Sequence, residues 1–246
     1  MSDGDRIGAE VSAITDADGT IRAAILAGRP IDPDLAERVA TLDFDGRTEL
    51  VDLGFVASLP RLRSLNLCGT GVRDLAPLAH ASGLERLVVM RTAVEDLSPL
   101  AGCPGLAELS IDRTPVTDLS PLAGSTALRL LDLGSAAIAD VAVLGVLPRL
   151  AVLDIGPAPA MRCLDLSGFP ALETLAGVAV GEATLWPSAF PANLRELIVG
   201  GAAWPEGRPL PDLPRLITPD WRLIDDGEPS SEVFAFWRLV CQAEEG

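Results

Sequence analysis

The sequence lacks most of the side chains on which nucleophilic enzymes depend. It contains no lysine, no tyrosine and one histidine among 246 residues. A nucleophile needs a base within hydrogen-bond reach and a third group that orients the base. The lone histidine, His80, falls on a variable part of its repeat, where a surface position is expected. The sequence therefore indicates no catalytic residue.

The four cysteines show neither paired spacing nor a CxxC motif. The usual zinc-binding patterns are thereby excluded, and a disulfide framework is not favoured. Cys103 and Cys163 fall where core residues are expected, and buried free thiols behave as small hydrophobes. This usage fits a reducing compartment, with no metal site.

Long apolar runs and phosphate-binding loops are also missing. Hydrophobic residues make up 48% of the chain, yet no run approaches the ~18–20 residues that cross a bilayer. The opening, MSDGDRIGAEV, is acidic and polar, unlike a signal peptide. Neither GxGxxG nor GxxxxGK[ST] occurs, so the sequence shows no glycine-rich loop that would bind nucleotide phosphates. We expect a cytoplasmic protein without cofactors.

One sign of charge dominates the chain, whose net charge is −16. Such a surface repels the phosphates of nucleic acid and anionic membrane faces. We therefore expect neither as a partner. Another protein, preferably a basic one, is the partner that this charge favours.

What the sequence does contain is a leucine that recurs every 22 residues. A fixed period in the twenties is typical of a stacked solenoid. The recurring positions are Leu62, Leu84, Leu106, Leu128, Leu150, Leu172, Leu194 and Leu216.

The repeat from Leu106, LAELSIDRTPVTDLSPLAGSTA, shows one complete unit. Leu109 and Ile111 are two apart and share one face of a short strand, whereas the residues between them face the opposite way. Thr114 marks a turn, where its hydroxyl can bond exposed backbone groups. Asp118 and the proline that follows it favour a 3₁₀ turn. Each unit therefore predicts a strand, a turn and a short helix.

Stacked units bury their leucines together, because a lone unit cannot. The predicted fold class is an α/β solenoid with a parallel sheet on its concave side and short 3₁₀ or irregular segments on its convex side. Residues 1–40 are predicted to form a helical N-terminal cap, with helices beginning near Asp16 and at Asp32. Residues 41–215 hold about eight repeats, and residues 216–246 form a C-terminal cap that contains a terminal helix. From Leu128 onward the strands are expected to continue and the short helices to fade.

The repeats resemble the bacterial 22-residue leucine-rich repeats of the internalin type, LxxLxLxxNxIxDLxPLxxLxx, with threonine where that family usually has asparagine. The resemblance covers roughly residues 40–216, and it implies a curved scaffold that binds proteins. The matching residues of one unit are Leu106, Leu109, Ile111, Thr114, Val116, Asp118, Leu119, Pro121 and Leu122.

The concave face is the predicted contact surface. Residues in one register lie ~5 Å apart on adjacent strands, so Arg86 beside Glu108 makes a favourable pair and Asp132 beside Asp154 a like-charge pair. Apolar residues among these charges are expected to face water, a mixture that is typical of protein interfaces. The predicted partner-binding residues are Arg86, Val88, Met90, Arg91, Glu108, Asp112, Arg113, Leu130, Asp132, Val152 and Asp154.

Three function classes remain open from the sequence. A non-catalytic protein-interaction scaffold fits the repeats best, and its acidity suggests an inhibitor or immunity-type protein that acts on a basic toxin or enzyme. An enzyme or enzyme accessory would use Asp132 and Asp154 as acid and base, with nearby arginines holding an anionic substrate. A nucleic-acid mimic would need acids regularly spaced on one face, and the 22-residue frame places only two in register. The oligomeric state does not follow from the sequence.

Overall fold

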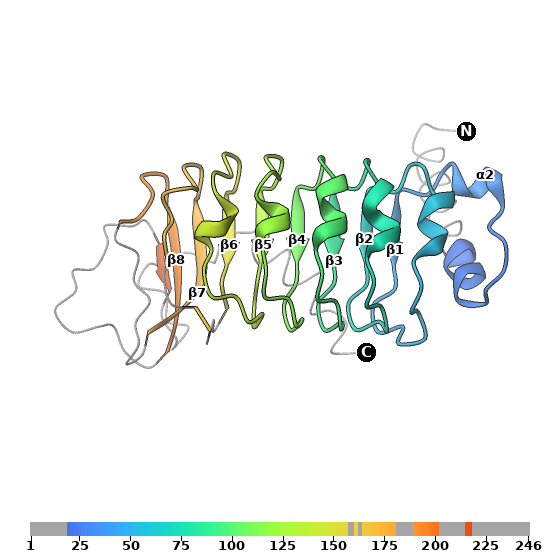
Figure 1. Cartoon of the computed structure of the whole chain (residues 1–246), viewed down its shortest axis with the longest axis horizontal. Coiled ribbons are helices and arrows are strands. Elements are labelled where there is room, and N and C mark those ends of the chain that lie inside the picture. Colours follow the sequence, from blue (N-terminus) through green and yellow to red (C-terminus); the bar gives the residue numbers. More distant parts are fainter. Residues whose placement is uncertain (1–18, 157–159, 162–163, 181–188, 202–214, 218–246) are drawn as a thin grey trace, which may run out of the picture.

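The computed structural model describes residues 19–156, 160–161, 164–180, 189–201 and 215–217. Among them, nine parallel strands form one sheet in sequence order, β1 to β9 (Figure 1). The repeat thus produces the predicted stack, with each coil adding one strand beside the last. The strands are β1 Thr41–Asp43, β2 Ser64–Asn66, β3 Arg86–Val88, β4 Glu108–Ser110, β5 Leu130–Asp132, β6 Val152–Asp154, β7 Thr174–Val180, β8 Glu196–Gly201 and β9 Arg215–Ile217.

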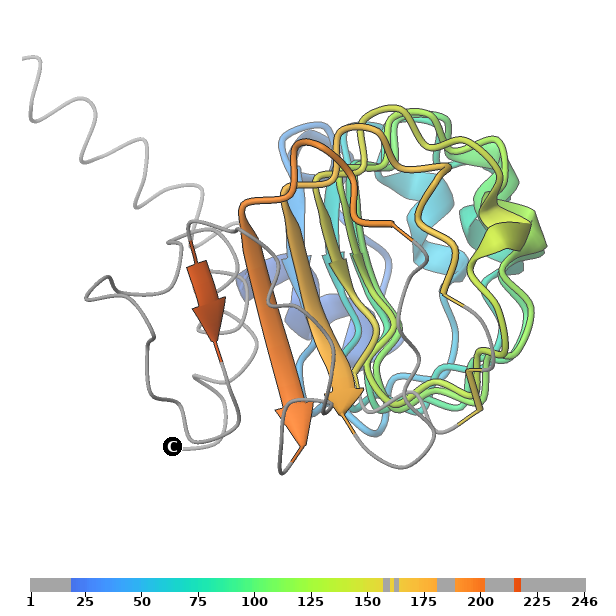
Figure 2. The same cartoon turned by 90° about the vertical axis from the view of Figure 1, so that its left-hand side faces the viewer.

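Short 3₁₀ helices lie across the core from the sheet, so that strands and helices occupy opposite sides of the coil (Figure 2). An aspartate opens each of them: Asp118 Oδ1, for example, accepts a hydrogen bond of 2.8 Å from the amide of Ser120. The proline of the repeat then occupies the first turn of η2, η3 and η4. The 3₁₀ helices are η1 Gly54–Ser58, η2 Ala76–His80, η3 Ser98–Gly102, η4 Ser120–Leu122 and η5 Ala142–Leu144.

The expectation that the short helices fade from Leu128 is wrong for the first coil after that point. There, η5 forms without the repeat's proline. Asp140 Oδ1 accepts from the amide of Ala142 at 2.8 Å, as the aspartates of earlier coils do. The aspartate is therefore sufficient to start this turn, because its carboxylate satisfies a backbone donor that the chain reversal leaves without a partner.

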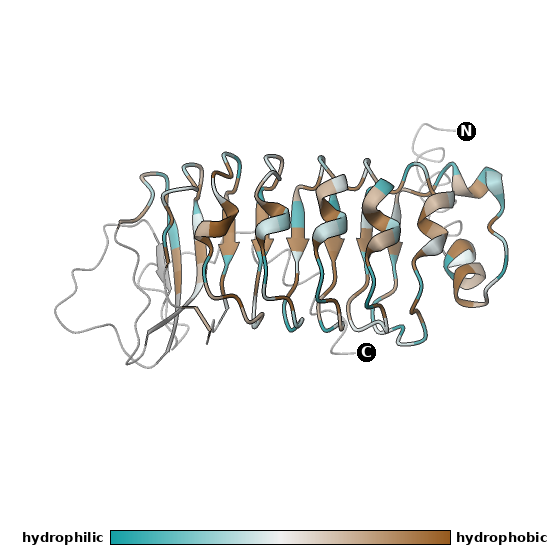
Figure 3. Cartoon of the chain, viewed as in Figure 1, coloured by the Kyte–Doolittle hydropathy of each residue, from teal (hydrophilic) through white to brown (hydrophobic). Residues whose placement is uncertain are grey.

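The repeating leucines make one continuous core between the sheet and the 3₁₀ helices. Leu87, Leu109 and Leu131 follow one another across β3, β4 and β5 and are fully buried. Brown segments recur in every coil of Figure 3, while teal gathers mainly in the connecting loops. The predicted turn threonines are buried too, and the hydroxyl of Thr114 donates to the carbonyl of Ile111 at 2.6 Å. Each of these threonines thereby provides a hydrogen bond to a backbone carbonyl in the turn of its own coil.

The helices predicted near the N-terminus are present in the described residues. Residues 19–26 are α-helical, and Ile21 on their inner side is buried against the first coil. The second helix, α2 Pro33–Ala36, begins at Asp32, whose Oδ1 accepts from the amide of Asp34 at 2.9 Å. The terminal helix predicted within 216–246 lies outside the described residues, as does Cys163. Within the described ranges, no helix is long and apolar enough to cross a membrane.

The 22-residue frame holds through the middle of the sheet and shifts at its ends. Thr41 pairs with Ser64, an offset of 23, so β1 is one residue out of step with the 22-residue spacing. At the other end the register predicted from the 22-residue spacing is wrong. It places Leu216 level with Leu194, whereas the structure pairs Leu216 with Leu197. A bulge in β7 also shifts its pairing with β8. Sheet register follows from hydrogen bonding between neighbours, and an irregular connection can absorb extra or missing residues.

Candidate partner-binding site on the concave face

The predicted site residues belong to β3–β6 and to the turns that follow β3 and β4. Strand pairing arranges those in the strands into two rows on the concave face, the sheet face that points away from the leucine core. Met90, Arg91, Asp112 and Arg113 come directly after the strands. The first row contains Arg86, Glu108, Leu130 and Val152, and the second row contains Val88, Ser110, Asp132 and Asp154.

The structure corrects the exposure that we expected for this face. Val88, Met90 and Val152 are 5%, 2% and 8% exposed, so the prediction that they face water is wrong. Asp132 and Asp154 are also buried, at 2% and 8%. Strand alternation decides to which face a side chain points, but what packs against that face decides whether it meets water.

The first row carries the predicted charge pair. Arg86 Nε lies 2.5 Å from Glu108 Oε2, and Arg129 Nη2 approaches the other carboxylate oxygen of Glu108 at 3.7 Å. Glu108 is the less exposed partner, because its side chain retains 16% of its accessible surface against 41% for Arg86. Leu130, next in the row, is half-buried. This row is therefore charged and partly accessible.

Arg91 and Arg113 occupy the turns after β3 and β4 in an unusual backbone conformation. Both have φ of 53°, in the left-handed region that disfavours side chains with a Cβ. One coil earlier the equivalent place belongs to Gly69, with φ of 65°. Both arginines are exposed, and Arg113 Nε lies 3.7 Å from Asp112 Oδ2. The chain thus holds two exposed arginines where glycine would relieve strain.

The second row brings together a buried acidic cluster. Asp132 lies in register between Ser110 and Asp154, and the hydroxyl of Ser110 donates to Asp132 Oδ2 at 2.6 Å. Oδ1 of Asp132 is buried and makes no hydrogen bond. The corresponding oxygen of Asp154 does have a partner, because Asp154 Oδ1 accepts a hydrogen bond of 2.7 Å from the amide of Gly156.

Burial raises the pKa of Asp132 to about 7, and the negative charges of Asp154 and Asp112 add to the rise. The hydroxyl of Ser110 and the amide of Gly134 partly offset it. Burial also raises the pKa of Asp154 above its ordinary value, against the lowering effect of the Gly156 amide. The negative charge of Asp154 thus opposes ionisation of Asp132.

A carboxyl group that titrates near neutral pH can act as a general acid or base. The buried side chain of Asp132 leaves little surface for a substrate, however. Nor does the described part of the chain group three or more His, Cys, Asp or Glu side chains so that they could hold a metal ion. A single basic or hydrogen-bonding group would satisfy the free Oδ1 atom.

Sequence reasoning missed two features of this region. It did not single out Ser110, the one side chain that bonds Asp132. It also missed that Cys68, Val88 and Met90 form an apolar cluster separate from the leucine core. The signal was present in the sequence, because these three residues occupy outward positions in two consecutive coils.

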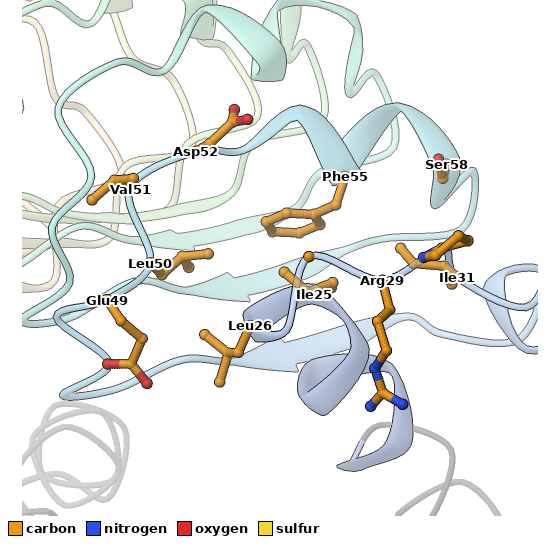
Figure 4. A pocket seen from close by; sticks show the side chains of 12 residues that line it. Ile25, Leu26, Arg29, Ile31, Glu49, Leu50, Val51, Asp52, Phe55 and Ser58 are labelled. Atoms are coloured by element: carbon orange, nitrogen blue, oxygen red, sulfur yellow. The ribbon is translucent and has the colours of Figure 1, made fainter.

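A hollow at the N-terminal end was not predicted either. It encloses about 420 Å³ between helix 19–26 and the first coil. Figure 4 shows Phe55 of η1 pointing toward Ile25 of that helix, with Arg29 and Glu49 nearer the rim. Apolar side chains such as Phe55 and Ile25 line it together with the charged side chains of Arg29, Glu49 and Asp52. It is a gap between the cap and the repeats, and no signal in the sequence indicates it.

The fold is similar to crystal structures of two internalins from Listeria monocytogenes. The chain is 22% identical to internalin InlF with a TM-score of 0.53, and the match covers 75% of this chain and 62% of InlF. It is 22% identical to internalin C2 with a TM-score of 0.55, covering 76% of this chain and 92% of internalin C2. The chain thus spans less than two thirds of InlF. Neither a protein-family model nor a curated protein sequence matches it. The fold is that of a leucine-rich repeat solenoid.

Proposed function

We propose that this protein is a non-catalytic scaffold that binds another protein on its concave side. The contact surface consists of the accessible residues of the first row and of the following turns: Arg86, Arg91, Glu108, Arg113 and Leu130. The half-buried Leu130 lies in register beside the charged Glu108, and such a mixture of apolar and charged side chains is typical of protein interfaces.

The observation that carries this proposal is the backbone of Arg91 and Arg113. A left-handed conformation costs a non-glycine residue of the order of 1 kcal/mol. The fold does not need a side chain there, because Gly69 occupies the same place in the preceding coil. Retaining two exposed arginines at that cost supports a role outside folding.

The acidity of the chain supports a basic protein as the partner. A net charge of −16 attracts such a protein over distances beyond direct contact, and the surface then fixes its orientation. An inhibitor or immunity-type protein that acts on a basic toxin or enzyme has this combination of properties.

The test compares proteins retained from the protein's own cell lysate by three immobilised chains. The first is the unmodified chain, and the second carries Leu130→Asp and Arg113→Glu on the concave side. The third is a matched control with Val143→Asp and Arg149→Glu on exposed residues near η5. We expect the first and third chains to retain the same proteins and the second to lose them.

Repeating the comparison at low and high salt separates long-range attraction from contact, because salt screens only the former effectively. If the concave-side variant retains the same proteins as the unmodified chain, the concave side is not the binding surface. Circular dichroism of all three chains checks that each is folded.

A further inference from the structure

The centre of the concave face is buried although it points away from the core. Ser110 is fully buried, and Asp132 and Met90 are each 2% exposed. The 3₁₀ helices and the buried leucines of the core lie on the other side of the sheet. Strand neighbours alone cover the flanks of a side chain in a sheet and leave its tip accessible. The side chains at the concave centre are therefore as buried as those of a sheet face on which another layer of the protein packs.

We propose that the chain's own C-terminal segment, residues 218–246, supplies this second layer and covers the concave centre. The sequence places that segment directly after β9, at the end of the sheet. Cys68, Val88 and Met90 are the apolar surface on which it docks.

The length of the chain allows this arrangement. Six strand spacings separate β9 from β3, which is a distance of about 29 Å. The segment 218–232 spans roughly 50 Å when extended. The apolar residues that begin at Val233 therefore reach the cluster at Val88 and Met90 with chain to spare.

The chemistry of the segment fits the surface. Residues 233–241, VFAFWRLVC, predict a helix that is apolar almost all round and must be buried on more than one side. Aromatic rings such as those of Phe234 and Trp237 pack well against the flexible thioether of Met90. The segment also brings Arg238, whose positive charge suits the acidic cluster in the second row.

This cover limits how far a partner can extend from the surface described under the proposed function onto the concave centre, and in that respect it rests on that function. A partner that needs the concave centre must displace the segment, so the segment lowers the apparent affinity by the fraction of chains in which it is docked. Arg91 and Arg113 remain exposed in the turns, where a partner can make its first contacts.

Alkylation of Cys68 tests the cover without a partner. Cys68 is a free thiol on the covered cluster and is 5% exposed, and Cys103 is a free thiol inside the leucine core at 1%. Alkylation of each cysteine by iodoacetamide at pH 8 is followed by peptide mass spectrometry. In the full-length chain carrying Phe234→Asp and Trp237→Asp, we expect Cys68 to react at least tenfold faster than in the unmodified chain.

Two controls make this result specific. The rate at Cys103 must stay unchanged, because it rises only if the whole repeat unfolds. The matched variant Val143→Asp with Val146→Asp introduces the same charges at residues that are 43% and 64% exposed, and it should leave Cys68 protected. An unchanged Cys68 rate in the folded Phe234→Asp, Trp237→Asp chain overturns the proposal.

A cross-link in the unmodified chain gives a second readout if that variant does not fold. In a reaction long enough to modify the slowly reacting Cys68, a short bismaleimide should join it to Cys241 within one chain. Joining only between chains, or protection of Cys68 that weakens on dilution, would show that a second copy is the cover and would overturn the proposal. Neither readout needs the partner. A negative result here therefore does not contradict the proposed function, and a negative result in the lysate experiment does not contradict the proposed docking of residues 218–246.

Discussion

Asp132 and Asp154 lie side by side on β5 and β6, and neither side chain is more than 8% exposed. Oδ1 of Asp132 is buried and makes no hydrogen bond. Two buried carboxyl groups in register cannot both ionise without cost, so this pair links the stability of the solenoid to pH.

We expect the protein to lose stability as the pH rises from about 4 to about 7. Burial raises the pKa of Asp132 from 3.8 to about 7, so the folded chain keeps a proton that the unfolded chain has released. The loss has an upper bound of the order of 4 kcal/mol. Urea unfolding at pH 5 and pH 8 measures the part of this loss that falls between those two pH values, and Asp132→Asn should flatten the difference.

A control for this effect is the exposed carboxyl of Asp118. The Ser120 amide lowers the pKa of Asp118, so its titration acts only in the acid range. Asp118→Asn should leave the difference between pH 5 and pH 8 unchanged. If Asp132→Asn retains the slope of the unmodified chain, Asp132 ionises normally in the fold.

Replacing Arg113 with glycine should stabilise the protein. The backbone of Arg113 has φ of 53°, and glycine adopts this conformation without a Cβ clash. We expect a gain of up to about 1 kcal/mol in the free energy of unfolding. Arg113→Ala keeps the Cβ and should give no such gain. Loss of partner binding together with the gain in stability would mark Arg113 as a contact residue, whereas a loss of stability would refute the strain.

Replacing Thr114 with valine should destabilise the coil that it closes. The buried hydroxyl of Thr114 donates to the carbonyl of Ile111 at 2.6 Å, and valine leaves that carbonyl without this bond. The expected cost is about 1–3 kcal/mol, measured by guanidinium unfolding. Thr117 is exposed, so Thr117→Val makes the same change in water and should have little effect. Equal effects at the two positions would remove the turn hydrogen bond as the explanation.

Leu109→Ala should destabilise the repeat by about 2–5 kcal/mol through the cavity that it leaves. Leu109 is fully buried between Leu87 and Leu131. Val146→Ala removes apolar atoms from a side chain that is 64% exposed and serves as the control for thermal unfolding. Loss of partner binding by Leu109→Ala at a temperature where it is folded would argue that the core contributes to recognition directly.

Particular residues show how far sequence reasoning reached. The spacing from Leu62 to Leu172 predicted the strands, because every coil must place its leucines on one side. Asp118 and Thr114 predicted the turns, since their side chains act on backbone groups two or three residues away. Reasoning was wrong at Leu216, where pairing follows the neighbouring strand rather than the residue count, and at η5, where proline was not needed.

The sequence by itself determined the solenoid, because a 22-residue period and local side-chain bonds repeat the same short-range rules in every coil. It also placed Arg86 beside Glu108 and Asp132 beside Asp154, since register follows from the period. Only the tertiary structure decided which of these residues meet water. Alternation along a strand assigns Val88, Met90 and Asp132 to the concave face, but burial depends on what packs on that face. That packing sets the pKa of Asp132 and leaves the arginines of the turns accessible.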